Sequence, residues 1–338
     1  MEASTVTVER TAGSALEQAR ATIERLQERA RAAIVGRDDV IELVLIALVA
    51  DGHVLLEDYP GSGKTTLARC LGDSLEGTGE GMIAAFRRVQ FTPDLLPSDV
   101  TGTSVFEMDT NRFSFRPGPV FTHVLLADEI NRTSPKVQAA LLEAMAEKQV
   151  TVDNHTYPLD SLFFVIATQN PLDVAGTYPL PTPQLDRFLF KIQMKHIERE
   201  AELDVLRHYP TPSLDRSARL PKVRRDALVA ARKAIRAEVH VAEPIREGLV
   251  DLARGLRAEA RVLQGASTRS LVLMLPALQA RAVMRGRDFV GPEDIEALAQ
   301  HVFAHRLECV PGVGDKREVI SECVAPVVER LARLSLRR

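Results

Sequence analysis

The 338-residue chain has three cysteines, no tryptophan and no long uninterrupted hydrophobic run. The cysteines, Cys70, Cys309 and Cys323, show no paired spacing, which argues against a disulfide framework and predicts a reducing, cytoplasmic setting. The longest apolar stretch, residues 40–50, is too short to cross a bilayer, so no membrane segment is expected. Residues 1–14 lack the apolar core of a signal peptide and are expected to form a flexible leader.

Aromatic residues make up only 5% of the chain and the formal net charge is −3. Neither a base-stacking platform nor a global basic field is therefore indicated, and no nucleic-acid partner is expected. The 45% hydrophobic and 26% charged residues are typical of a globular protein, and the length allows two domains with their own cores.

A glycine-rich segment, residues 58–66, follows the apolar run 54–56 and precedes an apolar helix pattern. Such a strand, turn and helix form a phosphate-binding loop, because glycine lets backbone N–H groups converge on phosphate at the positive helix end. We expect Lys64 to reach the outer phosphates of ATP and the Thr65 hydroxyl to coordinate Mg²⁺. Asp58 stands where the pattern has glycine, and the alternative is an ordinary glycine-rich turn. The expected ATP-binding residues in this loop are Pro60, Gly61, Ser62, Gly63, Lys64, Thr65 and Thr66.

A second apolar run, residues 124–127, ends in Asp128 and Glu129. An acid at the end of a buried strand beside a phosphate loop holds Mg²⁺, so Asp128 is expected to bind the metal and ATP. Glu129 is placed to polarise the water that attacks the γ-phosphate, a role that an ATPase needs and a kinase does not. The alternative is a solvated pair of carboxylates.

Strand and helix patterns alternate up to about residue 194, which predicts an α/β core with a parallel sheet and helices on both faces. An amphipathic helix, opened by Ser14 and Glu17, precedes the core, and together they are expected to span residues 15–198. Two predicted hairpins, at about 102–116 and 149–158, interrupt it. The expected strands are residues 54–56, 89–91, 124–127, 163–167 and 188–192.

Beyond residue 198 the strand pattern ends. We expect a linker over residues 199–225 and a small all-α domain over residues 226–338. The helices expected in this domain are residues 226–238, 243–263, 268–285, 292–303 and 316–336.

Several strings of residues together resemble the MoxR family of AAA+ ATPases, and the resemblance runs from about residue 34 to residue 307. It implies a AAA+ P-loop NTPase core of the clade with a helix-2 insert and a pre-sensor-1 hairpin, followed by an all-α lid. The two predicted hairpins fall where these insertions belong. The strings that carry the resemblance are residues 52–66, 90–99, 125–132, 167–171, 176–181 and 184–188.

The resemblance also implies roles that the residue pattern alone does not. Asn170 would be sensor 1, which holds the attacking water, and Arg187 would be an arginine finger inserted into a neighbouring subunit's site. Arg269 would be sensor 2, and Val35 and Gly36 would line the adenine pocket. From the residues alone these are a turn asparagine, two surface arginines and a plain loop.

Members of this family generally form hexameric rings that mature or activate other proteins, often with a partner carrying a von Willebrand factor A domain. The resemblance therefore implies a Mg²⁺-dependent ATPase that remodels a protein client in the manner of a chaperone. Three alternatives are a nucleic-acid-dependent motor, a non-hydrolytic nucleotide-switch scaffold and a small-molecule P-loop kinase. Asp109 and Asp153 at the hairpin tips disfavour the motor, and Glu129 disfavours the scaffold.

Two local features stand apart from the family pattern. The family commonly has Glu-Ala where this chain has Thr182-Pro183, just before Arg187, which leaves the aim of that arginine open. The second feature is a set of residues spaced to lie on one helix face, for which a packed or solvated face is expected rather than a metal site: His301, His305 and Cys309.

Overall fold

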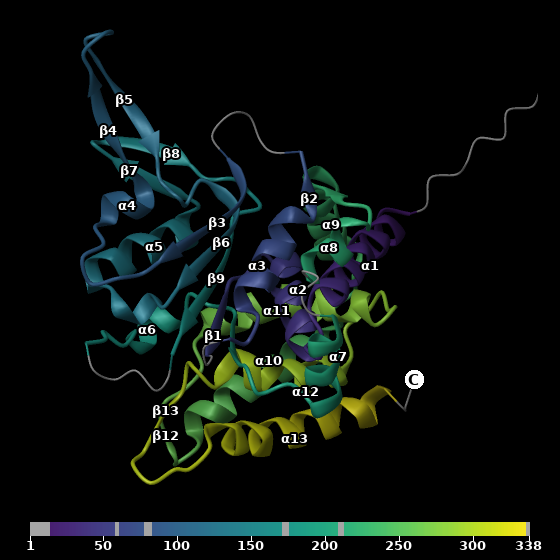
Figure 1. Cartoon of the computed structure of the whole chain (residues 1–338). Coiled ribbons are helices and arrows are strands. Elements are labelled where there is room, and N and C mark those ends of the chain that lie inside the picture. Colours follow the sequence, from purple (N-terminus) through teal and green to yellow (C-terminus); the bar gives the residue numbers. More distant parts are fainter. Residues whose placement is uncertain (1–13, 58–60, 78–82, 171–175, 209–212, 336–338) are drawn as a thin grey trace, which may run out of the picture.

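The computed structural model describes residues 14–57, 61–77, 83–170, 176–208 and 213–335 (Figure 1). Its centre is a five-stranded parallel sheet in the order β10-β1-β9-β6-β3. Each of the five runs predicted as strands contributes a strand to it, which confirms the predicted fold class. The strands are β1 (Val54–Glu57), β3 (Ala84–Gln90), β6 (Thr122–Asp128), β9 (Phe164–Gln169) and β10 (Phe190–Gln193).

Both faces of the sheet are covered. Successive side chains of a strand point in opposite directions, so each strand contributes to a core on either face. Val124 and Leu126 of β6 belong to one core, whereas Leu125 and Ala127 belong to the other. The first core includes residues of α1 (Ala15–Ala33), α2 (Asp38–Ala50), α3 (Lys64–Asp73) and the C-terminal helices. The second includes residues of α5 (Pro135–Glu147), the helix that follows the short η1 (Ile130–Arg132).

Two antiparallel hairpins lie on the same side of the molecule, away from the C-terminal helices (Figure 1). The predicted two-residue turn is confirmed, with Asp153 and Asn154 both at positive φ, 49° and 62°. The root of the first hairpin adjoins that of the second, since the rings of Phe115 and Tyr157 stack 3.8 Å apart. The segments concerned are α4 (Pro97–Thr101), β4 (Gly102–Glu107), β5 (Arg112–Pro117), β7 (Gln149–Val152) and β8 (His155–Pro158).

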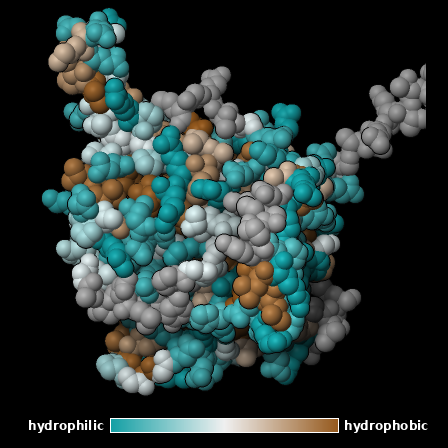
Figure 2. Space-filling view, in the orientation of Figure 1, coloured by the Kyte–Doolittle hydropathy of each residue, from teal (hydrophilic) through white to brown (hydrophobic). Residues whose placement is uncertain are grey.

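The β4–β5 hairpin is anchored by glycine and ends in exposed apolar side chains. A Cβ at Gly118 would lie 2.4 Å from the carbonyl oxygen of Val100, so the root admits no side chain at this position. At the projecting tip, which carries hydrophobic residues in Figure 2, Met108 is 88% exposed and Phe113 is 74% exposed. The Phe113 ring packs edge to face against Phe106, 5.2 Å away.

The segment expected as a linker, residues 199–225, contains two helices and a short strand. These are α7 (Arg199–His208), α8 (Ser213–Ala218) and β11 (Val223–Arg224), which pairs with β2 (Leu75–Glu76). The guanidinium of Arg29 in α1 holds this region by donating to the Leu220 carbonyl oxygen. The end of this segment is therefore attached to the core, while the expected domain boundaries remain a prediction.

The remaining helices form the predicted all-α part, with one correction. The helix expected over residues 243–263 ends at Ala258, because the chain then turns into β12 (Val262–Gln264), which pairs with β13 (Glu308–Cys309). None of the helices in the described part of the chain is long and apolar enough to cross a membrane. The helices are α9 (Arg225–Glu238), α10 (Glu243–Ala258), α11 (Thr268–Met284), α12 (Pro292–Phe303) and α13 (Lys316–Ser335).

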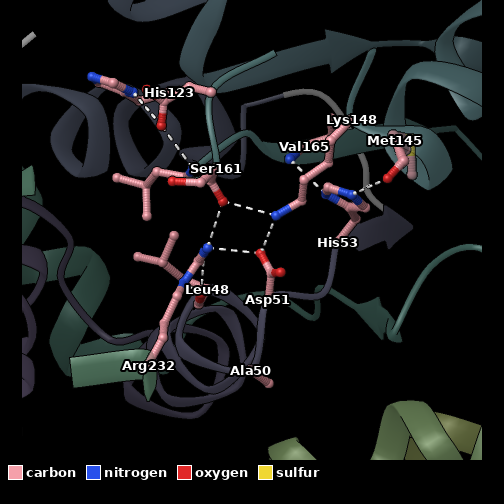
Figure 3. Close-up of polar contacts among 12 residues, drawn as sticks. Leu48, Ala50, Asp51, His53, His123, Met145, Lys148, Ser161, Val165 and Arg232 are labelled. Carbon is pink, nitrogen blue, oxygen red and sulfur yellow. Dashed lines mark hydrogen bonds and ion pairs between the residues drawn. The ribbon is translucent and has the colours of Figure 1, made fainter. Parts of the chain in front are cut away.

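A polar cluster joins this helical part to the sheet at the edge where the strands begin (Figure 3). Asp51, just before β1, accepts hydrogen bonds through Oδ1 from Lys148 Nζ at 2.6 Å and from Arg232 Nη1 of α9 at 2.7 Å. Both cations also donate to the carbonyl oxygen of Ser161. Beside them, Nε2 of the buried His53 bonds to the Met145 carbonyl oxygen. One carboxylate therefore connects α9, the root of the β7–β8 hairpin and the entrance to β1.

Candidate active site

The glycine-rich loop leads directly into α3, as the sequence predicts. Gly61 and Gly63 have φ values of 88° and 90°, a backbone conformation that side chains disfavour, and a Cβ at either position would meet open space. Gly63 is the N-cap of α3, so Lys64, Thr65 and Thr66 form its first turn and are half-buried. Backbone N–H groups at this helix end are oriented for an anion. Pro60 lies outside the described residues.

Asp128, the last residue of β6, is brought to the phosphate loop. Its side chain is buried, and its Oδ1 lies 3.5 Å from Lys64 Nζ. Thr168 at the end of β9 donates to Oδ1 at 2.7 Å, and Arg88 of β3 donates to Oδ2 at 2.7 Å. Burial acts to raise the pKa of Asp128, but the hydrogen bonds from Thr168 and Arg88 and the charge of Lys64 outweigh burial and lower it. Asp128 is therefore held as a carboxylate.

Glu129 follows in a left-handed conformation, with φ 58° and ψ 50°. The strand ends here, and the backbone N–H of Glu129 donates to the Thr168 hydroxyl at 2.9 Å. The carboxylate Oε2 accepts from Gln90 Nε2 at 2.7 Å and lies 3.1 Å from Arg132 Nε. A non-glycine residue in this backbone region carries strain, which fits a residue placed for function. Glu129 therefore directly follows Asp128 in the chain, but its own carboxylate is held by Gln90 and Arg132.

Several residues around these carboxylates were missed by the sequence reasoning. Arg88 and Gln90 come from β3, and Thr168 comes from β9, the two strands that flank β6. A second group surrounds Glu57 at the end of β1, whose Oε1 accepts from Gln169 Nε2 at 2.7 Å and lies 2.6 Å from Lys191 Nζ. Glu57, Thr168 and Gln169 directly follow predicted parallel strands, and this shared position is the signal that could have identified them, whereas Arg88 and Lys191 carry no such signal.

The residues present fit ATP and Mg²⁺. The loop offers a half-buried lysine, a helix N-terminus and two glycines with open space where a side chain would otherwise stand. The half-buried Thr65 hydroxyl and the ionised Asp128 are oxygen ligands of the kind that Mg²⁺ prefers. Lys64, Gly61, Gly63 and the first turn of α3 would hold the phosphates, while Thr65 and Asp128 would hold the metal.

Two further predicted positions lie on loops. Asn170 directly follows β9, on the same strand end as Thr168. Val35 and Gly36 lie between α1 and α2, where a Cβ at Gly36 would come within 2.6 Å of the Cβ of Ala201. The sensor and adenine-pocket roles of these residues stay predictions.

The two predicted arginines have contacts of different kinds. Arg187 donates through Nη1 to the Leu142 carbonyl oxygen of α5 at 2.7 Å, and lines a surface hollow of about 480 Å³ with Glu143, Glu147 and others. Arg269, in the first turn of α11, is half-exposed and lies 3.9 Å from Asp186. Neither contact involves the phosphate loop. The short helix α6 (Thr182–Leu185) forms before Arg187 with Pro183 in its first two positions, so proline is compatible with this helix start.

The three residues considered as a helical metal set do not share a helix. The helix α12 ends at Phe303, and Cys309 lies in β13. Burial lowers the pKa of His305, and its Nε2 bonds to the Phe188 carbonyl oxygen at 3.1 Å. Within the described ranges, no group of three or more histidine, cysteine or acidic side chains could hold a metal ion.

Comparisons with known proteins agree with this geometry. The family model described as "ATPase family associated with various cellular activities (AAA)" matches residues 53–190, and that of the AAA lid domain matches residues 254–323. A crystal structure of a proposed ATPase from Cytophaga hutchinsonii is similar with a TM-score of 0.82 and 36% identity, over 92% of this chain and 96% of that one. The fold is that of a AAA ATPase with a C-terminal lid.

Similarity to whole proteins narrows the class. The chain is 37% identical to Chaperone MoxR1 of Mycobacterium tuberculosis, over 85% of this chain and 75% of that protein. It is 32% identical to Protein MoxR of Methylorubrum extorquens, over 90% and 93%, and 43% identical to the uncharacterized protein YeaC of Bacillus subtilis, over 89% and 93%. The chain therefore belongs to the MoxR family of AAA+ ATPases, as its motifs predict.

Proposed function

We propose that this protein hydrolyses ATP at the subunit interfaces of a ring and uses the energy to remodel a protein client. The observation that carries the proposal is the pair Asp128 and Glu129 at the end of β6, with Asp128 3.5 Å from Lys64 of the phosphate loop. An ionised carboxylate for the metal and a second carboxylate for water are the two acids that hydrolysis needs.

In this mechanism Lys64 and the first turn of α3 bind the phosphates and neutralise part of their charge. Thr65 and Asp128 would hold Mg²⁺, which would supply further charge neutralisation. Glu129 accepts a proton from water while the water oxygen attacks the γ-phosphorus and the bond to the bridging oxygen breaks, which releases ADP and phosphate. Glu129 must first leave Gln90 and Arg132, so hydrolysis waits until that carboxylate turns toward the phosphate.

The ring is supported by the position of Arg187. Its guanidinium lies against α5, on a surface hollow shared with Glu143 and Glu147. An arginine in such a place is suited to act in a neighbouring copy, where it would neutralise charge on the transferring phosphoryl group. A hexamer is proposed because it is the assembly that the family resemblance implies, and head-to-tail contacts of this kind close into rings.

Client remodelling is supported by a relative and by the hairpins. One relative, 37% identical, is named a chaperone. The β4–β5 tip presents Met108 and Phe113 to solvent, and exposed apolar side chains grouped in this way are suited to contact a protein client. A cytoplasmic setting and a partner with a von Willebrand factor A domain belong to the same proposal.

The test is steady-state ATPase activity of wild type, Glu129→Gln and Arg187→Ala, alone and mixed, with the assembly mass measured in ATP. We expect each variant to lose roughly 10²-fold or more in turnover while still binding ATP. In the mixture, an Arg187→Ala subunit keeps its own Glu129 and receives an arginine from a Glu129→Gln neighbour. Activity should therefore return at about one interface in four.

Two results would count against the proposal. An active Arg187→Ala variant that remains a monomer would remove the shared site and favour a self-contained enzyme. Specific activity that stays constant across the concentration range of assembly would do the same. Stimulation by single-stranded DNA, without stimulation by any unfolded protein, would favour the nucleic-acid motor instead.

A further inference from the structure

One buried arginine of the lid, Arg306, donates hydrogen bonds to residues on both sides of Arg187. Arg306, just beyond the end of α12, is 3% exposed, and its Nε donates to Asp186 Oδ1 at 2.6 Å. The Asp186–Arg306 pair is separated by 120 residues in sequence. It therefore joins the lid to the core segment that carries Arg187.

The same guanidinium also binds the backbone of this segment. Its Nη2 donates to the Phe188 carbonyl oxygen at 2.6 Å and to the Asp186 carbonyl oxygen at 3.2 Å, and Nη1 donates to that of Leu189 at 3.2 Å. The neighbouring His305 adds a bond to the Phe188 carbonyl oxygen. Backbone groups before and after position 187 are thus fixed by one side chain, which constrains the direction in which Arg187 leaves the chain.

Arginine suits this task because of its geometry. The planar guanidinium carries five donors in a rigid fork, so it can fix a carboxylate and several carbonyl groups at once. A lysine at this position would keep the charge opposite Asp186 but could not span the same acceptors. Arg306 is 3% exposed and Asp186 is 22% exposed, so water has little access to the guanidinium, and a rotation of the lid is expected to pull on the segment rather than break a loose surface contact.

We propose that Arg306 is a positioning residue for Arg187: it transmits the orientation of the lid to the arginine that one subunit offers to the next. The inference rests on the proposed function, since it requires Arg187 to act in a neighbouring site. It makes the lid of one subunit a regulator of its neighbour's hydrolysis, in addition to any effect on its own bound nucleotide.

Asp186 is shared with a second lid arginine, which provides an internal contrast. Arg269 Nε lies 3.9 Å from Asp186 Oδ2, and its guanidinium is half-exposed. If Arg269 serves the nucleotide of its own subunit, a substitution of Arg269 impairs hydrolysis in that same subunit. A defect at Arg306 belongs to the neighbour's site, although both arginines face the same carboxylate.

The experiment mixes Arg306→Gln with each of two partners, Glu129→Gln and Arg187→Ala, and measures ATPase activity. Alone, Arg306→Gln should bind ATP with KM changed by less than about twofold and lose roughly 10²-fold in kcat, because displacement of a catalytic group by about 1 Å costs this much. Arg306→Gln should regain activity with Glu129→Gln, which supplies a correctly held Arg187. It should stay inactive with Arg187→Ala.

The opposite pattern, recovery with Arg187→Ala but not with Glu129→Gln, would show that Arg306 serves its own site and would overturn the inference. Recovery with neither partner by an assembled variant, or full activity alone, would also overturn it. Failure of the Glu129→Gln and Arg187→Ala pair to complement each other would instead reject the shared site itself.

Two further variants complete the experiment: an alternative in case Arg306→Gln misfolds, and a control. If Arg306→Gln does not assemble, Arg306→Lys is tested in the same two mixtures. Lysine keeps the positive charge opposite Asp186 and loses only the forked set of guanidinium donors. The matched control is Arg261→Gln, a lid arginine paired with Glu259 and Glu322 on the surface, which should have wild-type activity alone and leave about one interface in two active in either mixture, as wild type would.

Discussion

At the scale of single residues, one hydroxyl contacts both acidic residues of the site. Thr168 donates to Asp128 Oδ1 and accepts from the backbone N–H of Glu129. Its hydrogen bond is one of the causes that hold the pKa of Asp128 below its ordinary value against burial. A threonine without titratable chemistry therefore helps to keep Asp128 ionised.

We expect Thr168→Val to raise the pKa of Asp128, because burial remains and a stabilising hydrogen bond is lost. Activity requires the ionised form, so the acid limb of the ATPase pH profile should move to higher pH. Thr168→Ser keeps the hydroxyl and should keep the wild-type limb. The measurement is kcat/KM against pH for the three proteins, and an unshifted limb in Thr168→Val would show that the hydroxyl does not control ionisation.

The sequence predicts those site residues that lie together in the chain. Lys64 and Thr65 follow a glycine turn, and Asp128 and Glu129 end an apolar run, so each pair is recognisable locally. Arg88 and Gln90 were not predicted because their role depends on β3 lying beside β6, where Gln90 is in register with Asp128. The role of Arg306 was not predicted for the same reason, because no residue near it in the sequence indicates that it contacts Asp186.

At the scale of elements, strands and helices with a clear period were predicted, including both edge strands of the main sheet, whereas several short elements were not. Residues 259–263 extend the pattern of α10 but instead lead into β12, because that strand pairs with β13 from a distant part of the chain. The helix α7 lies in a segment that proline residues mark as a linker. The pairing with β13 decided the first of these, and a local pattern does not contain it.

The β4–β5 hairpin should tolerate change at its tip and not at its root. We expect Met108→Ser and Phe113→Ser to alter the free energy of unfolding by less than about 0.5 kcal/mol, since these side chains are exposed. Phe115→Ala removes the stack on Tyr157 and should cost about 1–2 kcal/mol. Urea denaturation of the three variants measures both effects, and equal losses at tip and root would contradict the assignment.

At the scale of the whole molecule, sheet and lid share one hydrophobic core, which extends from Leu16 to Leu331. Asp51 adds a polar connection by binding Lys148 and Arg232 (Figure 3). Replacement of this carboxylate would leave the two cations facing each other at the junction. The core and the lid are therefore expected to unfold together, in one transition.

We expect Asp51→Asn to lower the free energy of unfolding by about 2–3 kcal/mol, as removal of one member of a half-buried ion cluster does. Asp38→Asn, which breaks the exposed pair with Arg31, is the control and should cost less than about 0.5 kcal/mol. Urea titration followed by circular dichroism measures both. Similar losses in the two variants would mean that Asp51 contributes no more than a surface charge.

The glycine-bound root of the β4–β5 hairpin has a consequence for how such a protein diversifies. The close approach at Gly118 and the ladder from Gly102 to Pro117 hold the hairpin without help from its tip. The tip residues can therefore be substituted together without a change in the rest of the fold. Under the proposed function, exchanging a few residues of this loop is expected to direct the protein to a different client.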